Sequence, residues 1–160
     1  MKPRLFWPLL LTLVLTDCGT KRLAVEHLTP PHVPHDVFGD LVRFTLAYNP
    51  GAAFSISLGS YSRLGFSLIA IVILGVLAWL YRQTPSTDRW QVVALACVCG
   101  GAIGNLLDRL RSPRGVVDFI DLGVGDVRFW TFNIADVAVL TGAVLLAMRL
   151  WRADQEPAPG

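Results

Sequence analysis

The sequence predicts an all-α membrane protein, a bundle of four transmembrane helices with a small β-sheet on the extracytoplasmic membrane surface. Three observations support this class. Of the 160 residues, 53% are hydrophobic and only 16% are charged, against about 25% charged residues in ordinary soluble domains. Four stretches are long and apolar enough to cross a bilayer. One polar segment between the first two stretches alternates like a strand.

The four predicted spans each approach the 20 or so helical residues that cross a hydrocarbon core. They cover about residues 5–24, 64–81, 90–107 and 129–148. All five tryptophans lie near span ends, as is typical of side chains that favour the membrane interface. They are Trp7, Trp79, Trp90, Trp130 and Trp151. Residues 153–160 are polar, and we expect them to form a disordered cytoplasmic tail.

The first span also resembles a secretory signal, because basic residues precede a short apolar run. Cys18 could then be a lipid-attachment site, but Asp17 stands where a small residue is expected and three spans follow. We therefore interpret the segment as a retained helix. Asp17 and Lys21 are four residues apart and share one helical face. They form either an ion pair at the helix end or part of a polar pocket.

The outer β-region is predicted over about residues 40–58. Apolar side chains occupy alternate positions of its first strand, at Val42, Phe44, Leu46 and Tyr48. A turn and a second extended segment are expected from Asn49 to Ser55. The preceding stretch, with Pro30, Pro31 and Pro34, is expected to be irregular.

Two aspartates stand among large apolar residues. Asp118 lies in the loop after the third span, and Asp136 lies about two turns into the fourth, where a charge costs about 2.5–3.5 kcal/mol. Two carboxylates brought close share a proton, because both cannot ionise. Such a pair can activate a water and protonate a peptide group. The same pattern could make a proton relay, and Asp108 or Asp121 could be the partner instead.

Other function classes find little support in the composition. The net charge of +2 and the absence of Lys/Arg runs argue against nucleic acid binding. Cys18, Cys97 and Cys99 have no metal-ligand spacing, so we interpret them as packing residues. No metal or cofactor is expected. From the residues alone, a small proton-coupled transporter and a non-enzymatic membrane assembly factor stay open as alternatives to an enzyme.

Five motifs, in chain order, resemble those of the bacterial lipoprotein signal peptidases, the type II signal peptidases. They are DCGTK from Asp17, NPGAAFS from Asn49, GGAIGNLLDR from Gly100, VVDF from Val116 and FNIAD from Phe132. The match therefore extends from Asp17 to Asp136. This resemblance implies a single membrane protease domain over residues 1–152.

The resemblance further implies an aspartyl-type intramembrane endopeptidase. It would remove the signal peptide from diacylglyceryl-modified prolipoproteins by cleaving before the lipidated lipobox cysteine. The catalytic pair would be Asp118 and Asp136. Substrate-binding or supporting roles would fall to Asp17, Lys21, Asn49, Gly104, Asn105, Arg109 and Asn133. On the residues alone, Asn133 could instead cap the fourth span, and Arg109 could steady the outer loop or contact a lipid phosphate.

The expected setting is the bacterial inner membrane, with both termini cytoplasmic and the active site toward the periplasm. The count of Lys and Arg, six on the terminal face and eight on the other, does not establish this orientation. Expected partners are prolipoprotein substrates and membrane lipids. We also expect a monomer that is inhibited by globomycin-type cyclic peptides.

Overall fold

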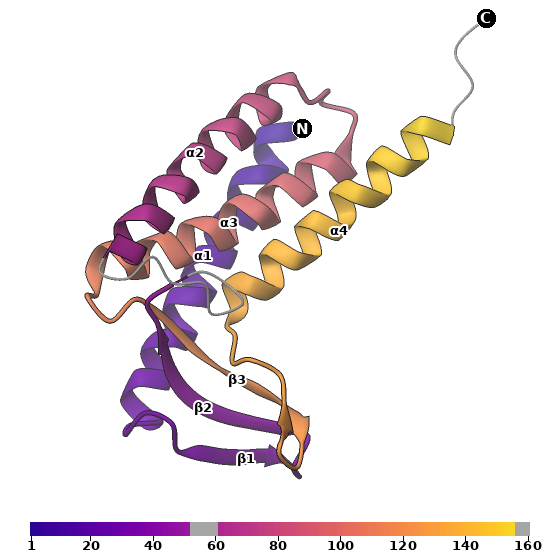
Figure 1. The fold of residues 1–160 in the computed structure, drawn as a ribbon. Helices are drawn as coiled ribbons and strands as arrows, with labels where there is room; N and C mark the ends of the chain where they lie inside the picture. The colour runs from indigo at the N-terminus through magenta and orange to yellow at the C-terminus, as the bar shows by residue number, and fades with distance from the viewer. Residues whose placement is uncertain (52–60, 156–160) are drawn as a thin grey trace, which may run out of the picture.

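The computed structural model describes residues 1–51 and 61–155, which form four helices and a four-stranded sheet. The helices are α1 (Lys2–His27), α2 (Ser62–Gln83), α3 (Arg89–Arg111) and α4 (Ile134–Gln155). The strands are β1 (Pro34–Phe38), β2 (Val42–Asn49), β3 (Val116–Val124) and β4 (Val127–Arg128). Figure 1 shows the helices gathered in one bundle and the sheet projecting from one end of it.

Helix α3 is the centre of the bundle, because it packs against each of the other three helices. Its small residues allow this close approach. A Cβ atom on Gly101 would overlap the carbonyl oxygen of Ala135 and lie 2.7 Å from Val139 Cγ2. Glycine at position 101 therefore brings the start of α4 directly against α3.

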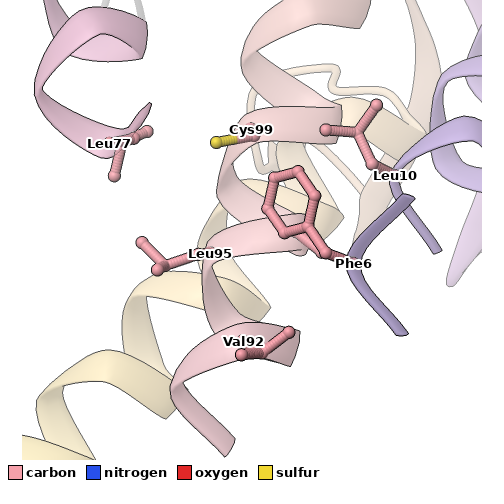
Figure 2. Packing of buried hydrophobic residues seen from close by; sticks show 7 residues of the cluster. Phe6, Leu10, Leu77, Val92, Leu95 and Cys99 are labelled. Carbon is pink, nitrogen blue, oxygen red and sulfur yellow. The ribbon is translucent and has the colours of Figure 1, made fainter. Parts of the chain in front are cut away.

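A cluster of buried apolar side chains joins α1, α2 and α3. Figure 2 shows these side chains pointing toward one another, and they include Phe6, Leu10, Leu77, Val92, Leu95 and Cys99. Lipid tails are as apolar as these side chains, so van der Waals packing rather than release of water holds such a cluster together within a membrane. Cys99 lies in this cluster as a packing residue, as predicted.

Within the described part of the chain, three helices are long and apolar enough to cross a membrane. These are α2, α3 and the part of α4 from Ile134 to Arg152, with mean hydropathies of 2.4, 1.7 and 1.7. Helix α1 has 26 residues but does not meet the same criterion. Its second half contains Asp17, Lys21 and Arg22, which lower its hydropathy. The fold therefore confirms a membrane helix bundle, but only three of the four predicted spans.

The sheet is antiparallel with the order β1-β2-β3-β4. Strand β2 was predicted, and it pairs with β3 so that Ala47 lies opposite Asp118. Strand β1 forms where an irregular stretch was expected. All five of its residues are exposed. A strand with no buried face needs no alternation of apolar and polar residues, so its sequence carries no signal that would predict it. Residues 52–58 of the predicted β-region lie outside the described residues.

The segment expected to be an outer loop after the third span is strand β3. Its first four residues, 116–119, are all buried. A strand that is buried on both faces shows a continuous apolar run rather than alternation, so its periodicity does not identify it.

The start of the fourth predicted span, residues 129–133, is not helical. Phe129 N donates to Leu122 O at 2.7 Å, and Phe132 forms a bridge with Ile120. The two ends of the segment 129–132 are therefore bonded to β3, and α4 begins at Ile134. As a result, Asp136 lies in the first turn of α4 instead of two turns into a span. At its other end, α4 continues to Gln155, so the first three residues of the predicted tail are helical.

Candidate active site

The junction between the sheet and α4 brings Asp118 and Asp136 together. The pairing of residue 132 with β3 positions this junction: Phe119 N and Ile120 N both donate to Phe132 O, at 3.0 and 2.8 Å. Asn133, the next residue, is fully buried between β3 and α4. Its amide nitrogen Nδ2 also lies 3.3 Å from Val117 O. Asn133 is therefore fixed to the strand that carries Asp118 and to the helix that carries Asp136.

Asn133 contacts both aspartates. Its Nδ2 donates to Asp118 Oδ1 at 2.6 Å, and its backbone N–H donates to Asp136 Oδ2 at 3.1 Å. In return, the backbone N–H of Asp136 donates to Asn133 Oδ1 at 3.0 Å. This reciprocal pair is a capping box, which satisfies free N–H groups at the start of α4. Asn133 thus caps the helix, as one alternative predicted, and also joins the two carboxyl groups.

Asp118 is only 3% exposed on β3. Burial in an apolar strand disfavours its charged form, and the nearby Asp136 carboxylate repels a second charge. Together these effects raise the pKa of Asp118 to about 7, although hydrogen bonds from Asn133 and Asn49 favour the ionised form. The two carboxyl groups can therefore hold one proton between them near neutral pH.

A second group of polar side chains lies beside this pair. Lys21 Nζ lies 2.8 Å from Asp17 Oδ2 and 3.0 Å from Asp108 Oδ2. Asp17 Oδ1 accepts a hydrogen bond of 2.9 Å from Ala135 N at the start of α4. Asp17 and Lys21 are both buried, so they face a polar interior and do not form an exposed ion pair at a helix end. The alternative of an exposed pair at a helix end is therefore wrong, and a functional role for the two residues stays a prediction.

Gly104 lies on α3 directly against Asp17. A Cβ atom at this position would overlap Asp17 Oδ2. Glycine is therefore required for the buried carboxylate to fit between α1 and α3.

Asn105 connects the two polar groups. It accepts from Lys21 Nζ at Oδ1, at 2.8 Å, and donates from Nδ2 to Asp136 Oδ1, also at 2.8 Å. One turn later on α3, Arg109 donates to Asn105 O at 3.2 Å and to Gly51 O at 3.4 Å. Asn49 Oδ1 accepts from Gly51 N at 3.0 Å. Arg109 and Asn49 thus hold the end of the described outer segment beside the aspartates.

A cavity of about 910 Å³ opens at the two aspartates. Its polar end is lined by Asn49, Asn105 and Arg109 as well as by Asp118 and Asp136. Its apolar wall is formed by the segment before α4 and by one face of α4. This wall includes Phe129, Trp130, Phe132, Val137, Leu140 and Ala143. The arrangement combines a pair of carboxyl groups with a long apolar surface.

The two alternative partner aspartates lie elsewhere. Asp108 pairs with Lys21 and accepts from Val117 N at 3.1 Å. Asp121 is held by Arg128 Nε at 3.0 Å and by the Thr45 hydroxyl at 3.2 Å. Neither lines the cavity. The structural role of Asp108 was not predicted, although its position three residues after Asn105 on one helix face could have indicated it.

The apolar wall of the cavity was also not predicted. Residues such as Leu140 lie in an apolar stretch long enough to cross a membrane. In such a stretch the sequence does not distinguish a residue that lines a cavity from one that contacts lipid. Among residues 1–51 and 61–155, no group of three or more His, Cys, Asp or Glu side chains is arranged to hold a metal ion.

Comparison with known proteins shows clear similarities. The family model described as signal peptidase (SPase) II matches residues 9–152. The chain is 38% identical to a lipoprotein signal peptidase of Psychromonas ingrahamii, over 96% of this chain and 89% of that protein. It is 37% identical to one of Pseudomonas putida, over 98% and 92%. A solved bacterial membrane enzyme aligns with a TM-score of 0.83 at 27% identity, covering 95% of this chain and 91% of the other.

Proposed function

This chain belongs to the signal peptidase II family, and we propose that it cleaves diacylglyceryl-modified prolipoproteins before the lipidated cysteine, with Asp118 and Asp136 as its catalytic pair. Family membership makes it a peptidase of a bacterial membrane that acts on lipoprotein precursors. The transporter and assembly-factor alternatives are therefore wrong. The finer proposal concerns the mechanism, the cleavage site and the orientation in the membrane.

The main observation behind the proposal is that Asn133 is hydrogen-bonded to both Asp118 and Asp136. One buried residue contacts both carboxyl groups at the head of the cavity: its side-chain amide donates to Asp118, and its backbone N–H donates to Asp136. Burial and the Asp136 carboxylate raise the pKa of Asp118 to about 7, so Asp118 is the group that holds the shared proton. Asp136 accepts hydrogen bonds at both of its oxygens, from Asn105 and Asn133, and we assign it the role of the base.

This division supplies both an acid and a base for peptide hydrolysis. Ionised Asp136 takes a proton from a water, whose oxygen attacks the scissile carbonyl carbon, while Asp118 gives its proton to the carbonyl oxygen. The tetrahedral intermediate then breaks its C–N bond. The hydroxyl proton returns to Asp118, and the proton held by Asp136 passes to the leaving amine. One water is consumed, and the pair returns to its starting state.

The apolar wall of the cavity supports a substrate that carries lipid. Leu140 lines the cavity and is 67% exposed on α4, on a helix apolar enough to contact a bilayer. A lipid chain on the cysteine could therefore remain against α4 while the peptide lies at the polar end. In this arrangement the scissile bond, which precedes the cysteine, lies next to the carboxyl groups.

We further propose that α1 is the fourth span. It packs against α3 and α4, and its charged Asp17 and Lys21 are paired inside the bundle, which offsets the cost of placing them in a membrane. Figure 1 shows the start of α1 and the last turns of α4 at the end of the bundle opposite the sheet. This arrangement supports termini on one side, the cytoplasm, and an active site on the periplasmic side.

Purified protein in detergent would be assayed with a diacylglyceryl-modified lipobox peptide. Asp118→Asn and Asp136→Asn should each reduce cleavage by at least about 100-fold, because each removes the acid or the base. Asp126→Asn, an exposed aspartate in the β3–β4 turn, is the matched control and should cleave normally. Normal cleavage by a folded Asp118→Asn or Asp136→Asn protein would refute the catalytic pair.

The cleavage assay also tests the expectations about ligands, and light scattering tests the oligomeric state. An unlipidated peptide should be cleaved poorly, because it cannot occupy the apolar wall. A globomycin-type cyclic peptide should compete with the substrate. Light scattering of the purified protein should give the mass of a monomer within its detergent micelle.

A further inference from the structure

We propose that Lys21 is a positioning residue, which orients the Asn105 side chain so that Asn105 donates a hydrogen bond to Asp136. This inference rests on the proposed function, because it assigns the role of a residue that acts through Asp136. Lys21 itself does not line the cavity. Its charge acts on Asp118 from a distance, and its hydrogen-bonded connection to Asp136 runs through Asn105.

Lys21 is held in a fixed position. Its side chain is 3% exposed, although lysine normally keeps its ammonium group in water. Three acceptors surround Nζ: Asp17 Oδ2 at 2.8 Å, Asp108 Oδ2 at 3.0 Å and Asn105 Oδ1 at 2.8 Å. An ammonium group has N–H donors and no acceptor. Its contact with Asn105 is a hydrogen bond, and its contacts with the two carboxylates are ion pairs. The ammonium group can therefore offer Asn105 nothing except a donor.

Two donors face the oxygen of the Asn105 amide. Oδ1 accepts from Lys21 Nζ at 2.8 Å and from Asn133 Nδ2 at 3.1 Å. If the amide were rotated by half a turn, its NH₂ group would face these two donors and its oxygen would face the Asp136 carboxylate. Both contacts would then be repulsive. Lys21 and Asn133 thus select the orientation in which Nδ2 donates to Asp136 Oδ1.

The positive charge of Lys21 is balanced by its neighbours, so its effect on Asp136 depends on how it orients the Asn105 amide. Asp17 on α1 and Asp108 on α3 offset its positive charge. The carboxylate of Asp136 repels that of Asp118 on β3 and attracts the guanidinium group of Arg109 on α3. A correctly oriented Asn105 therefore directs its NH₂ group, and not its oxygen, at the carboxylate that is the proposed base.

The primary test is steady-state cleavage of the diacylglyceryl-modified lipobox peptide by Lys21→Met. We expect kcat to fall about 10- to 100-fold, the usual effect of losing a hydrogen bond to a charged group, with KM little changed. Lys2→Met is the matched control, since it removes the other lysine of α1 and should leave both kcat and KM unchanged.

A double-mutant cycle separates this role from a general structural one. If Lys21 acts through Asn105, the combination of Lys21→Met with Asn105→Ala should reduce kcat no more than the stronger single substitution. If the two losses multiply, the positioning role is wrong. A folded Lys21→Met protein with the kcat of the wild type, or one in which only KM changes, would also overturn it.

Removing Lys21 leaves two buried aspartates without their counter-charge, which can prevent folding. The variant Lys21→Met/Asp17→Asn removes a charge of each sign and keeps a side-chain oxygen at position 17 for Ala135 N, so it provides the measurement if the single variant does not fold. Asp118→Asn and Asp136→Asn are assayed in parallel. If either one cleaves normally, the proposed function fails; if both are inactive and the folded Lys21 variant behaves as wild type, only this inference fails.

Discussion

At the scale of single residues, the chemistry depends on the different surroundings of two carboxyl groups. Asp118 is enclosed by β3 and the segment before α4, whereas Asp136 receives donors at the first turn of α4. The resulting pKa of Asp118, about 7, lies far above its ordinary value of 3.8. Two measurable consequences follow from this shift.

The first consequence is an alkaline loss of activity. Below about pH 7, Asp118 keeps the proton that the carbonyl oxygen requires, and above it this proton is lost. We therefore expect kcat/KM to fall as pH rises above about 7, approaching tenfold per pH unit. Cleavage of the lipidated peptide between pH 5 and 9 would measure it. A rate that is constant from pH 7 to 9 would contradict the assignment of the proton to Asp118.

The second consequence concerns stability. Because the folded-state pKa of Asp118 is raised, its contribution to stability is fully present below pH 3.8 and is lost as pH rises toward about 7. Asp118→Asn should therefore gain stability relative to wild type at pH 8, by up to about 4 kcal/mol. Thermal denaturation in detergent at pH 5 and pH 8 would measure the change. Asp126→Asn is the control, and an equal Tm difference at both pH values for Asp118→Asn would contradict the prediction.

At the scale of elements, the site depends on close contacts between helices. Asp17 of α1 fits against α3 only where Gly104 leaves space, and its other oxygen accepts from the start of α4. One carboxylate therefore connects three helices. The capping box of Asn133 and Asp136 then begins α4 at the point where the sheet ends.

Gly104→Ala should destabilise the protein by about 1–3 kcal/mol, because the new methyl group overlaps the buried Asp17 carboxylate. Cleavage activity should fall as well, since Asp17 pairs with Lys21. Thermal denaturation and peptide cleavage would show both effects. In Gly19→Ala the new methyl group meets no atom within 4 Å, so this α1 variant should be neutral or slightly stabilising. Similar behaviour of the two variants would refute the packing argument.

At the scale of the whole molecule, the sheet and the bundle together form the cavity. Arg128 connects the two hairpins of the sheet: Nε donates to Asp121 Oδ1 at 3.0 Å, and Nη1 donates to Asp40 O at 2.6 Å. Arg128 also lines the cavity on the side of the hairpins. It therefore stabilises a wall that would contact substrate without touching the two carboxyl groups.

Arg128→Gln should raise KM for the lipidated peptide several-fold and leave kcat nearly unchanged. The reason is that the hairpin contacts the substrate equally in the ground state and in the transition state, so loosening it weakens both by the same amount. Steady-state kinetics would measure the two constants separately. Arg22→Gln is a suitable control, because Arg22 is exposed and pairs only locally with Glu26. A large fall in kcat with unchanged KM would show that Arg128 acts on the chemistry instead.

The sequence by itself determined the membrane class, three apolar helices and the family. It also singled out Asp118 and Asp136, because carboxylates are rare among so many apolar residues. These features are local, since hydropathy and motif spacing can be read from neighbouring residues. The sequence did not predict β1, whose exposed residues carry no periodic signal, or β3, whose continuous apolar run is ambiguous.

Only the tertiary structure decided where α4 begins and which groups meet. Residues 129–132 are apolar enough to continue a span, but their hydrogen bonds to β3 hold them in the sheet. The same contact places Asn133 between the two carboxyl groups. Separate contacts pair Asp108 with Lys21 and Asp121 with Arg128. Each of these outcomes depends on pairing between segments that are distant in the chain, and this is why the local pattern of the sequence could not predict it.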